Sequence, residues 1–173
     1  MTHDQTKAMT LGGRIVIIRD GFIQQIGTPQ EVFHYPADLF GAGFIGTPQM
    51  DLSQDAKLLL EGGQYAVEIF GKKFPLLERQ QAALKAANCP AGPVIAGVRP
   101  QHIHLEYGGI SSQLEMVEMM GSEQHLYLNI GGREVVAIVP TTGTGNRPEM
   151  GEIDFLPENI HLSNPQTEKN LLA

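Results

Sequence analysis

The chain has 173 residues, of which 12 are Lys or Arg and 19 are Asp or Glu, so its formal net charge at pH 7 is −7. This acidic balance offers no electrostatic footprint for a nucleic-acid backbone or an anionic membrane surface, and we expect no nucleic-acid partner. The 42% of hydrophobic and 18% of charged residues indicate a folded, globular protein.

The chain has a single cysteine, Cys89, which limits the disulfides and metal sites that it can form. It excludes a disulfide within the chain and a cluster of several thiolates on one metal, and it fits a reducing, cytoplasmic setting. The first residues lack the basic and apolar regions of a signal peptide, and no stretch approaches the roughly 18 apolar residues of a membrane span. We therefore expect no direct membrane insertion, so that any association with a membrane would go through a protein partner.

Residues 1–47 are predicted to form a small α+β unit that begins with a short helix and a hairpin. Asp20 and Gly21 lie between two apolar runs at residues 14–18 and 22–26. Glycine accepts the positive φ that a tight turn imposes, so this pattern predicts a hairpin.

Two short helices are predicted after the hairpin. Thr28 is placed as the N-cap of the first one, with a proline at the first helical position and Glu31 three residues on, as in a capping box. Pro36 must follow its end, and a second apolar piece at residues 38–45 stops at a Gly-Thr-Pro sequence. We predict a domain boundary after residue 47.

Residues 48–173 are predicted to form a second, mainly β domain. Short apolar runs alternate there with Gly, Pro and Asn, which is typical of a small barrel or sandwich, and an OB-like barrel is the natural candidate. The expected strands are residues 65–70, 94–98, 114–119, 125–130, 135–139 and 153–156, and the expected helix is residues 78–88.

Two stretches superficially match phosphate-binding motifs. Residues 60–64 (LEGGQ) look like the LSGGQ signature of ABC ATPases, but the alternating residues 65–69 predict a strand and make the glycines a hairpin turn. Residues 71–73 (GKK) lack both the upstream Gly and the Ser or Thr of a P-loop. The sequence thus contains neither a Walker A nor a Walker B motif.

His102 and His104 alternate, so on a strand both would face one side. No carboxylate or cysteine is spaced to complete a metal site with them, and we expect solvated or hydrogen-bonded histidines and no metal. Residues 141–151 are polar and glycine-rich, which predicts an exposed loop.

Several motifs, in order, resemble the ATP-binding subunits of carbohydrate-type ABC importers, such as the maltose and glycerol-3-phosphate importer ATPases. The H-loop and following hairpin of that family resemble residues 2–11 (THDQTKAMTL), 14–16 (RIV), 20–21 (DG) and 24–29 (QQIGTP). The exit from its nucleotide-binding domain resembles residues 35–37 (YPA) and 44–48 (FIGTP). Its TOBE regulatory domain resembles residues 97–103 (GVRPQHI), 117–118 (VE), 121–123 (GSE) and 159–162 (NIHL).

The resemblance implies an incomplete ATP site. The family histidine at the position of His3 is the switch histidine, which contacts the γ-phosphate of ATP, and the P-loop, signature and Walker B motifs lie upstream of it. His3 would therefore be orphaned, and we expect no enzyme activity and no cofactor for this chain, whereas the full-length family uses Mg-ATP. Gly13 stands where the family usually has Asp, and Gln101 replaces a common acidic residue.

The resemblance also implies partners and a location. The family uses this domain for homodimerisation and regulation, works with permease subunits and a solute-binding protein, and lies at the inner face of the plasma membrane. The candidate ligand- or partner-binding residues in the TOBE-like motifs are Arg99, Gln101, His102, Gly121, Ser122 and Glu123.

The alternative function is a small-ligand module, since TOBE-like domains of molybdate proteins bind oxyanions. An oxyanion or a sugar would be the ligand, and a positively lined crevice would favour this reading, with Arg99 and Arg133 available. In either case the apolar residues 11–45 are expected to leave a patch exposed, or covered by self-association, without an ATPase core to pack on.

Overall fold

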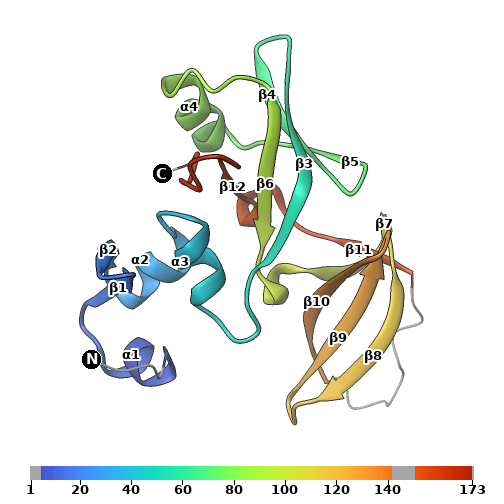
Figure 1. Cartoon of the computed structure of the whole chain (residues 1–173). Coiled ribbons are helices and arrows are strands. Elements are labelled where there is room, and N and C mark those ends of the chain that lie inside the picture. Colours follow the sequence, from blue (N-terminus) through green and yellow to red (C-terminus); the bar gives the residue numbers. More distant parts are fainter. Residues whose placement is uncertain (1–4, 142–150, 173) are drawn as a thin grey trace.

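The computed structural model describes residues 5–141 and 151–172 of the chain (Figure 1). The N-terminal segment comprises α1 (Gln5–Leu11), a hairpin of β1 (Ile15–Arg19) and β2 (Phe22–Gly27), α2 (Pro29–His34) and α3 (Leu39–Phe44). In Figure 1 this segment lies beside the β-rich remainder of the chain. None of the described helices has the length and apolar composition needed to cross a membrane.

The hairpin turn and the capping box predicted for the N-terminal segment are confirmed. Asp20 and Gly21 have φ of 52° and 83° and form the two-residue turn of the β1–β2 hairpin. The Thr28 backbone N–H donates to the Glu31 carboxylate at 2.7 Å and the Glu31 N–H donates to the Thr28 hydroxyl at 3.3 Å, which completes the capping box. Asp38 caps α3 by accepting a 2.9 Å bond from the Gly41 N–H.

Three sheets form the rest of the chain. The largest has the strand order β12-β6-β3-β4-β5, the second has the order β10-β9-β8, and β11 pairs with β7. The first contains β3 (Asp51–Glu61), β4 (Gln64–Ile69), β5 (Lys72–Pro75), β6 (Gly92–Val98) and β12 (His161–Ser163). The others contain β7 (His104–Ser111), β8 (Gln113–Met119), β9 (Glu123–Ile130), β10 (Arg133–Pro140) and β11 (Glu152–Asp154). Helix α4 (Glu78–Ala86) and the 3-10 turns η1 (Pro100–His102) and η2 (Pro157–Asn159) complete the fold.

The core of this part lies where the sheets meet. Leu58, Val67, Leu126, Leu128 and Ile153 are all at most 1% exposed and belong to one cluster. Gly109 is required at the crossing of β7 and β11, because a Cβ there would lie 2.2 Å from the Ile153 carbonyl oxygen. A separate cluster in the N-terminal segment contains Ile15, Ile17, Val32 and Ile45. The mainly β prediction is confirmed, and the boundary after residue 47 stays a prediction.

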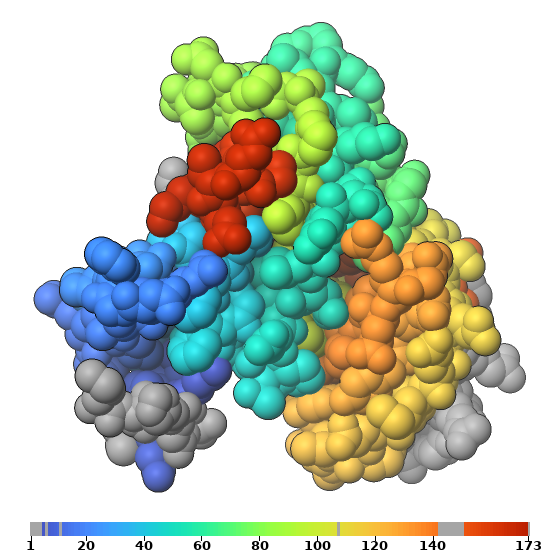
Figure 2. Space-filling model, viewed as in Figure 1, coloured from blue at the N-terminus to red at the C-terminus, as the bar shows by residue number. Residues whose placement is uncertain are grey.

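The C-terminal residues join the two parts. The Leu39 N–H donates to the Glu168 carbonyl at 2.9 Å, the Asn170 N–H donates to the Ala37 carbonyl at 3.0 Å, and the Asn170 side chain donates to the Pro36 carbonyl at 2.7 Å. Figure 2 shows this red segment lying against the blue N-terminal segment on one side and the green α4 region on the other.

The sequence-based prediction missed four strands, of which β3 is the longest. Strand β3 was not expected, because polar residues interrupt its apolar pattern where a bulge lies between Ser53 and Ala56. His102 and His104 do not share a strand, so the arrangement considered for them, with both side chains on one side of a strand, does not occur. His102 ends η1 and His104 begins β7, since Pro100 starts a 3-10 turn there. Strands β5, β7 and β12 were also not expected.

Candidate functional site

Among the predicted site residues that the structure describes, only Arg99 is fully buried, with 1% of its surface exposed. It precedes η1, and its guanidinium donates from Nη1 to the Ile45 carbonyl at 2.7 Å and from Nε to the Phe33 carbonyl at 3.1 Å. The Arg99 Cζ also lies 3.8 Å from the centroid of the Phe33 ring. Burial lowers the pKa of Arg99 to about 10, so the group stays charged at neutral pH. Arg99 thus fastens the β-rich part to the N-terminal segment.

A junction cavity of about 250 Å³ adjoins this arginine. It brings together three of the predicted residues, Arg99, Gln101 and Glu123, with residues 46–48 of the connecting segment. Gly46 has φ of 119°, and a Cβ there would approach Arg99 Nη1 to 3.2 Å, so a side chain at this position would be strained and crowded. The Glu123 carboxylate lies 3.3 Å from Nε2 of the buried His125.

The remaining predicted residues lie outside this cavity. His102 is half-buried, its Nδ1 has no hydrogen-bond partner among the described residues, and burial, followed by the charge of Arg99, lowers its pKa. Gly121 and Ser122 form the exposed β8–β9 turn, where their carbonyls accept bonds of 3.0 and 2.9 Å from Thr141. His3 and most of the predicted loop at residues 141–151 lie outside the described residues.

Metal binding finds no support in the part of the chain that the structure describes. There, no three side chains of His, Cys, Asp or Glu come together as a cation would require.

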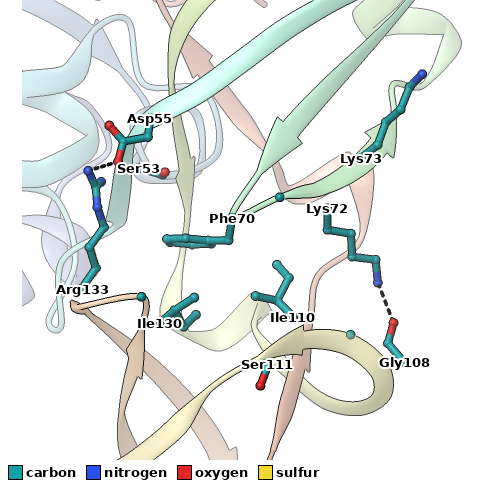
Figure 3. A pocket seen from close by; sticks show the side chains of 13 residues that line it. Ser53, Asp55, Phe70, Lys72, Lys73, Gly108, Ile110, Ser111, Ile130 and Arg133 are labelled. Carbon is teal, nitrogen blue, oxygen red and sulfur yellow. Dashed lines mark hydrogen bonds and ion pairs between the residues drawn. The ribbon is translucent and has the colours of Figure 1, made fainter.

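A larger groove of about 770 Å³ lies where the three sheets meet, and the sequence did not reveal it (Figure 3). Its walls are β3 at residues 53 and 55, the β4–β5 turn at residues 70–71, the bulged part of β7 at 108–111, and the end of β9 with the turn that follows it at 130–131. Phe70, Ile110 and Ile130 supply its apolar surface. These residues are far apart in the chain, so no local motif could signal the site.

The charged side chains of the groove are paired. Lys72 Nζ lies 2.7 Å from the Asp154 carboxylate and also donates to the Gly108 carbonyl at 3.4 Å. Arg133 pairs with Asp55 on the opposite wall, as Figure 3 shows. The groove therefore offers donors and acceptors with little net charge, and it is not the positively lined crevice that an oxyanion site would need.

A small inner cavity of about 40 Å³ adjoins the groove. Ser53, Phe70 and Arg133 line both spaces, so the groove and the inner cavity adjoin at these residues. Ser53 is 5% exposed, and its hydroxyl has no hydrogen-bond partner among the described residues. Asp51 also lines the inner cavity, and burial raises its pKa to about 7 although it accepts a bond from the Val136 N–H.

The chain is similar to a known domain family and to several known proteins. Residues 96–162 match the family model described as TOBE domain. The uncharacterized ABC transporter ATP-binding protein YcjV of Escherichia coli O157:H7 is 36% identical over 171 residues, which are 97% of this chain and 46% of that protein. The sn-glycerol-3-phosphate import ATP-binding proteins UgpC of Ruegeria sp. and Chromobacterium violaceum are 33% and 34% identical, over 99% of this chain and 46% and 45% of their own lengths. The chain thus spans about half the length of the curated relatives it matches.

Proposed function

The chain carries a TOBE domain and corresponds to the C-terminal part of the ATP-binding subunits of ABC importers, and from this premise we propose that it is the regulatory and dimerisation portion of such a subunit. The transported substrate would be a sugar or a related polyol compound, in keeping with the names of the glycerol-3-phosphate relatives. Permease subunits, a solute-binding protein and a second copy of the chain are the partners in this proposal. Its location would be the cytoplasmic face of the membrane.

The observation that carries the proposal is the hydrogen-bonded attachment of the N-terminal segment to the TOBE domain. Arg99 lies inside the matched residues 96–162 and binds carbonyls of Phe33 and Ile45, which precede them. A change in the TOBE domain would therefore move the N-terminal segment with it, and a regulatory domain requires such a connection to the part that it controls.

The N-terminal hairpin has a surface suited to contact an ATPase domain. Ile15 and Ile17 of β1 are buried against the N-terminal segment, whereas Val16 and Ile26, which pair across the hairpin, are 46% and 53% exposed. A strand that is apolar on both faces is typical of a sheet covered on both sides. We propose that the exposed face of this hairpin packs on an ATPase core.

Nucleotide assays test the proposal directly. Equilibrium binding of a fluorescent ATP analogue and Mg-dependent ATP hydrolysis would be measured on this chain alone, and neither is expected because the sequence has no Walker A or Walker B motif. Steady turnover by the purified chain would overturn the proposal.

A chimera tests the regulatory role. The chain would replace the matching 46% of the Ruegeria relative, and ATP hydrolysis and dimerisation of the hybrid would be compared with those of the intact relative. A hybrid carrying Arg99→Met should lose coupling between the two parts, while Arg79→Met, an exposed arginine on α4, serves as the control. Identical behaviour of the two variants would contradict the coupling role.

A further inference from the structure

We propose that the groove between the three sheets binds a neutral sugar or polyol, whose carbon face packs on Phe70 and one of whose hydroxyl groups reaches Ser53. This site lies away from the Arg99 junction. The inference goes beyond the regulatory role proposed above and does not depend on it, because it rests on the groove alone.

Phe70 has a backbone conformation that its side chain disfavours. With φ of 50° it occupies the first position of a two-residue turn between Ile69 and Lys72, and Gly71 follows with φ of 78°. Asn, Asp or Gly is the usual residue at such a position, and a bulky residue with positive φ is a genuine outlier. Strain of this kind gathers at ligand-binding sites. Here it places an aromatic residue where the groove and the inner cavity adjoin.

Ser53 supplies an unsatisfied hydrogen-bonding group beside that ring. A buried hydroxyl without a partner destabilises a folded protein, so its presence calls for an explanation. The inner cavity of about 40 Å³ has room for one group of the size of a water molecule. A ligand hydroxyl placed there would give Ser53 the partner that it lacks among the described residues.

The charge distribution selects a neutral ligand. Each cation of the groove already has a carboxylate partner, so an anion would gain little net attraction there, and Glu152, which accepts a bond from the Gly108 N–H, adds a further negative charge at the rim. Hydroxyl groups both donate and accept, so they can bond to either member of an ion pair without breaking it. The three ion pairs at the groove are Lys72–Asp154, Lys73–Glu61 and Arg133–Asp55.

The apolar surface of the groove matches the other half of such a ligand. Figure 3 shows the Phe70 ring above Ile110 and Ile130, with the polar side chains arranged around them. A sugar presents C–H groups on its faces and hydroxyl groups on its edges, so its face can pack on the ring while its edges bond to the rim. Pockets that combine an apolar surface with a few placed polar groups are typical small-molecule sites.

The test is a heteronuclear NMR titration of the whole chain with D-glucose, maltose and glycerol, and separately with inorganic phosphate and glucose 6-phosphate. At least one of the three neutral compounds should bind saturably, with a dissociation constant of about 1 mM or tighter, and shift the amide signals of Gly71, Gly109 and Gly131. Absence of saturable binding by all three, or binding by the phosphates alone, would overturn the inference.

Matched variants separate a ligand-binding role from a structural one. Ser53→Ala should raise the thermal midpoint and weaken sugar binding about fivefold, because it removes an unpaired buried hydroxyl that the ligand uses. Ser112→Ala is the control, since the Ser112 hydroxyl is also buried without a partner among the described residues but lies outside the groove. It should raise the midpoint and leave binding unchanged. Equal affinities of the two variants would refute the role of Ser53.

Phe70→Asn provides a second, independent readout. Asn suits the positive φ of the turn, so the hairpin should persist while the aromatic surface is lost and affinity falls about tenfold. Phe22→Asn, which changes a residue 74% exposed on the N-terminal hairpin, should bind as the wild type does. Unaltered binding by a folded Phe70→Asn variant would count against the inference.

Discussion

Arg99 Nη1 donates a 2.7 Å hydrogen bond to the Ile45 carbonyl oxygen, and this bond joins two separate hydrophobic clusters of the molecule. Ile45 belongs to the cluster of the N-terminal segment, and the neighbour of Arg99 on β6, Val98, belongs to the cluster of the sheets. The two parts of the molecule are thus held together by a buried cation that donates to two backbone carbonyls, in addition to any apolar contact between them.

Replacing Arg99 should therefore destabilise the whole chain. Arg99→Met leaves the carbonyls of Phe33 and Ile45 buried and unpaired, which should lower the free energy of unfolding by roughly 3 kcal/mol. Urea denaturation checks this, with Arg79→Met as the control because Arg79 is exposed and donates to a single carbonyl. Arg99→Lys should recover only part of the loss, since an ammonium group cannot reproduce the planar fork. A loss no larger than that of the control would refute the fastening role.

Asp51 should make the chain less stable as the pH rises. Burial raises its pKa from 3.8 to about 7, so between these values the folded state binds a proton that the unfolded state has released. Stability contributed by this group is therefore full below pH 4 and is lost up to about pH 7, by at most about 4 kcal/mol. Asp51→Asn should remove this loss and be more stable than the wild type at pH 8.

Denaturation at a series of pH values measures the Asp51 effect. Asp20→Asn, which changes an exposed turn residue whose positive φ suits Asn, is the control and should keep the wild-type slope. An Asp51→Asn profile parallel to that of the wild type would show that the carboxyl group is not responsible.

His161 should make the chain less stable as the pH falls, in contrast to Asp51. Burial, followed by the charge of Arg99, lowers its pKa from 6.5 to about 4, so in this interval the unfolded state binds a proton that the folded state does not. The stability is complete above pH 6.5 and falls as the pH drops towards 4, by at most about 3 kcal/mol. His161→Gln should flatten this part of the profile, whereas a change at the exposed His104 should not. An imidazole titration by NMR that places His161 near 6.5 would contradict the prediction.

The local features of the fold could be predicted from the sequence because each depends on neighbouring residues. The Asp20–Gly21 turn, the Thr28 capping box and the turn at Gly62–Gly63, between strands β3 and β4, are all set by residues a few positions apart. That last turn also confirms that residues 60–64 are not a nucleotide-binding signature. The β3 strand escaped prediction because its partners, β4 and β6, rather than its own apolar pattern, hold it in place.

The candidate site was less predictable, for a physical reason. Arg99 was selected from its motif, but its role depends on carbonyls 54 and 66 residues away. The groove is assembled from turns of different sheets, and the distinguishing features of Ser53 and Phe70 are a missing hydrogen bond and a positive φ. Neither property is visible in residue types, so only the folded chain reveals them.

The exposed face of the N-terminal hairpin should drive self-association when no other domain covers it. Val16, Ile18, Ile23 and Ile26, which form two cross-strand pairs on one face of the hairpin, are between 46% and 60% exposed. Such a concentration of apolar side chains is unusual on the surface of an isolated protein, and burying it in a dimer removes it from water. The chain should sediment as a dimer or larger species at high concentration.

Charge placed on that face should abolish the association. Val16→Lys with Ile26→Lys introduces two like charges at a cross-strand pair. Burying these charges in a dimer interface would cost much of their hydration free energy, and the apolar contacts of Val16 and Ile26 would be lost. Equilibrium sedimentation should then give a monomer, and the double variant should remain folded because Ile15 and Ile17, on the opposite face, still fill the core of the segment. Lys57→Glu with Lys85→Glu, which changes two exposed lysines of β3 and α4, is the control and should leave the association unchanged. A wild-type chain that stays monomeric at high concentration would contradict the prediction that this face drives self-association.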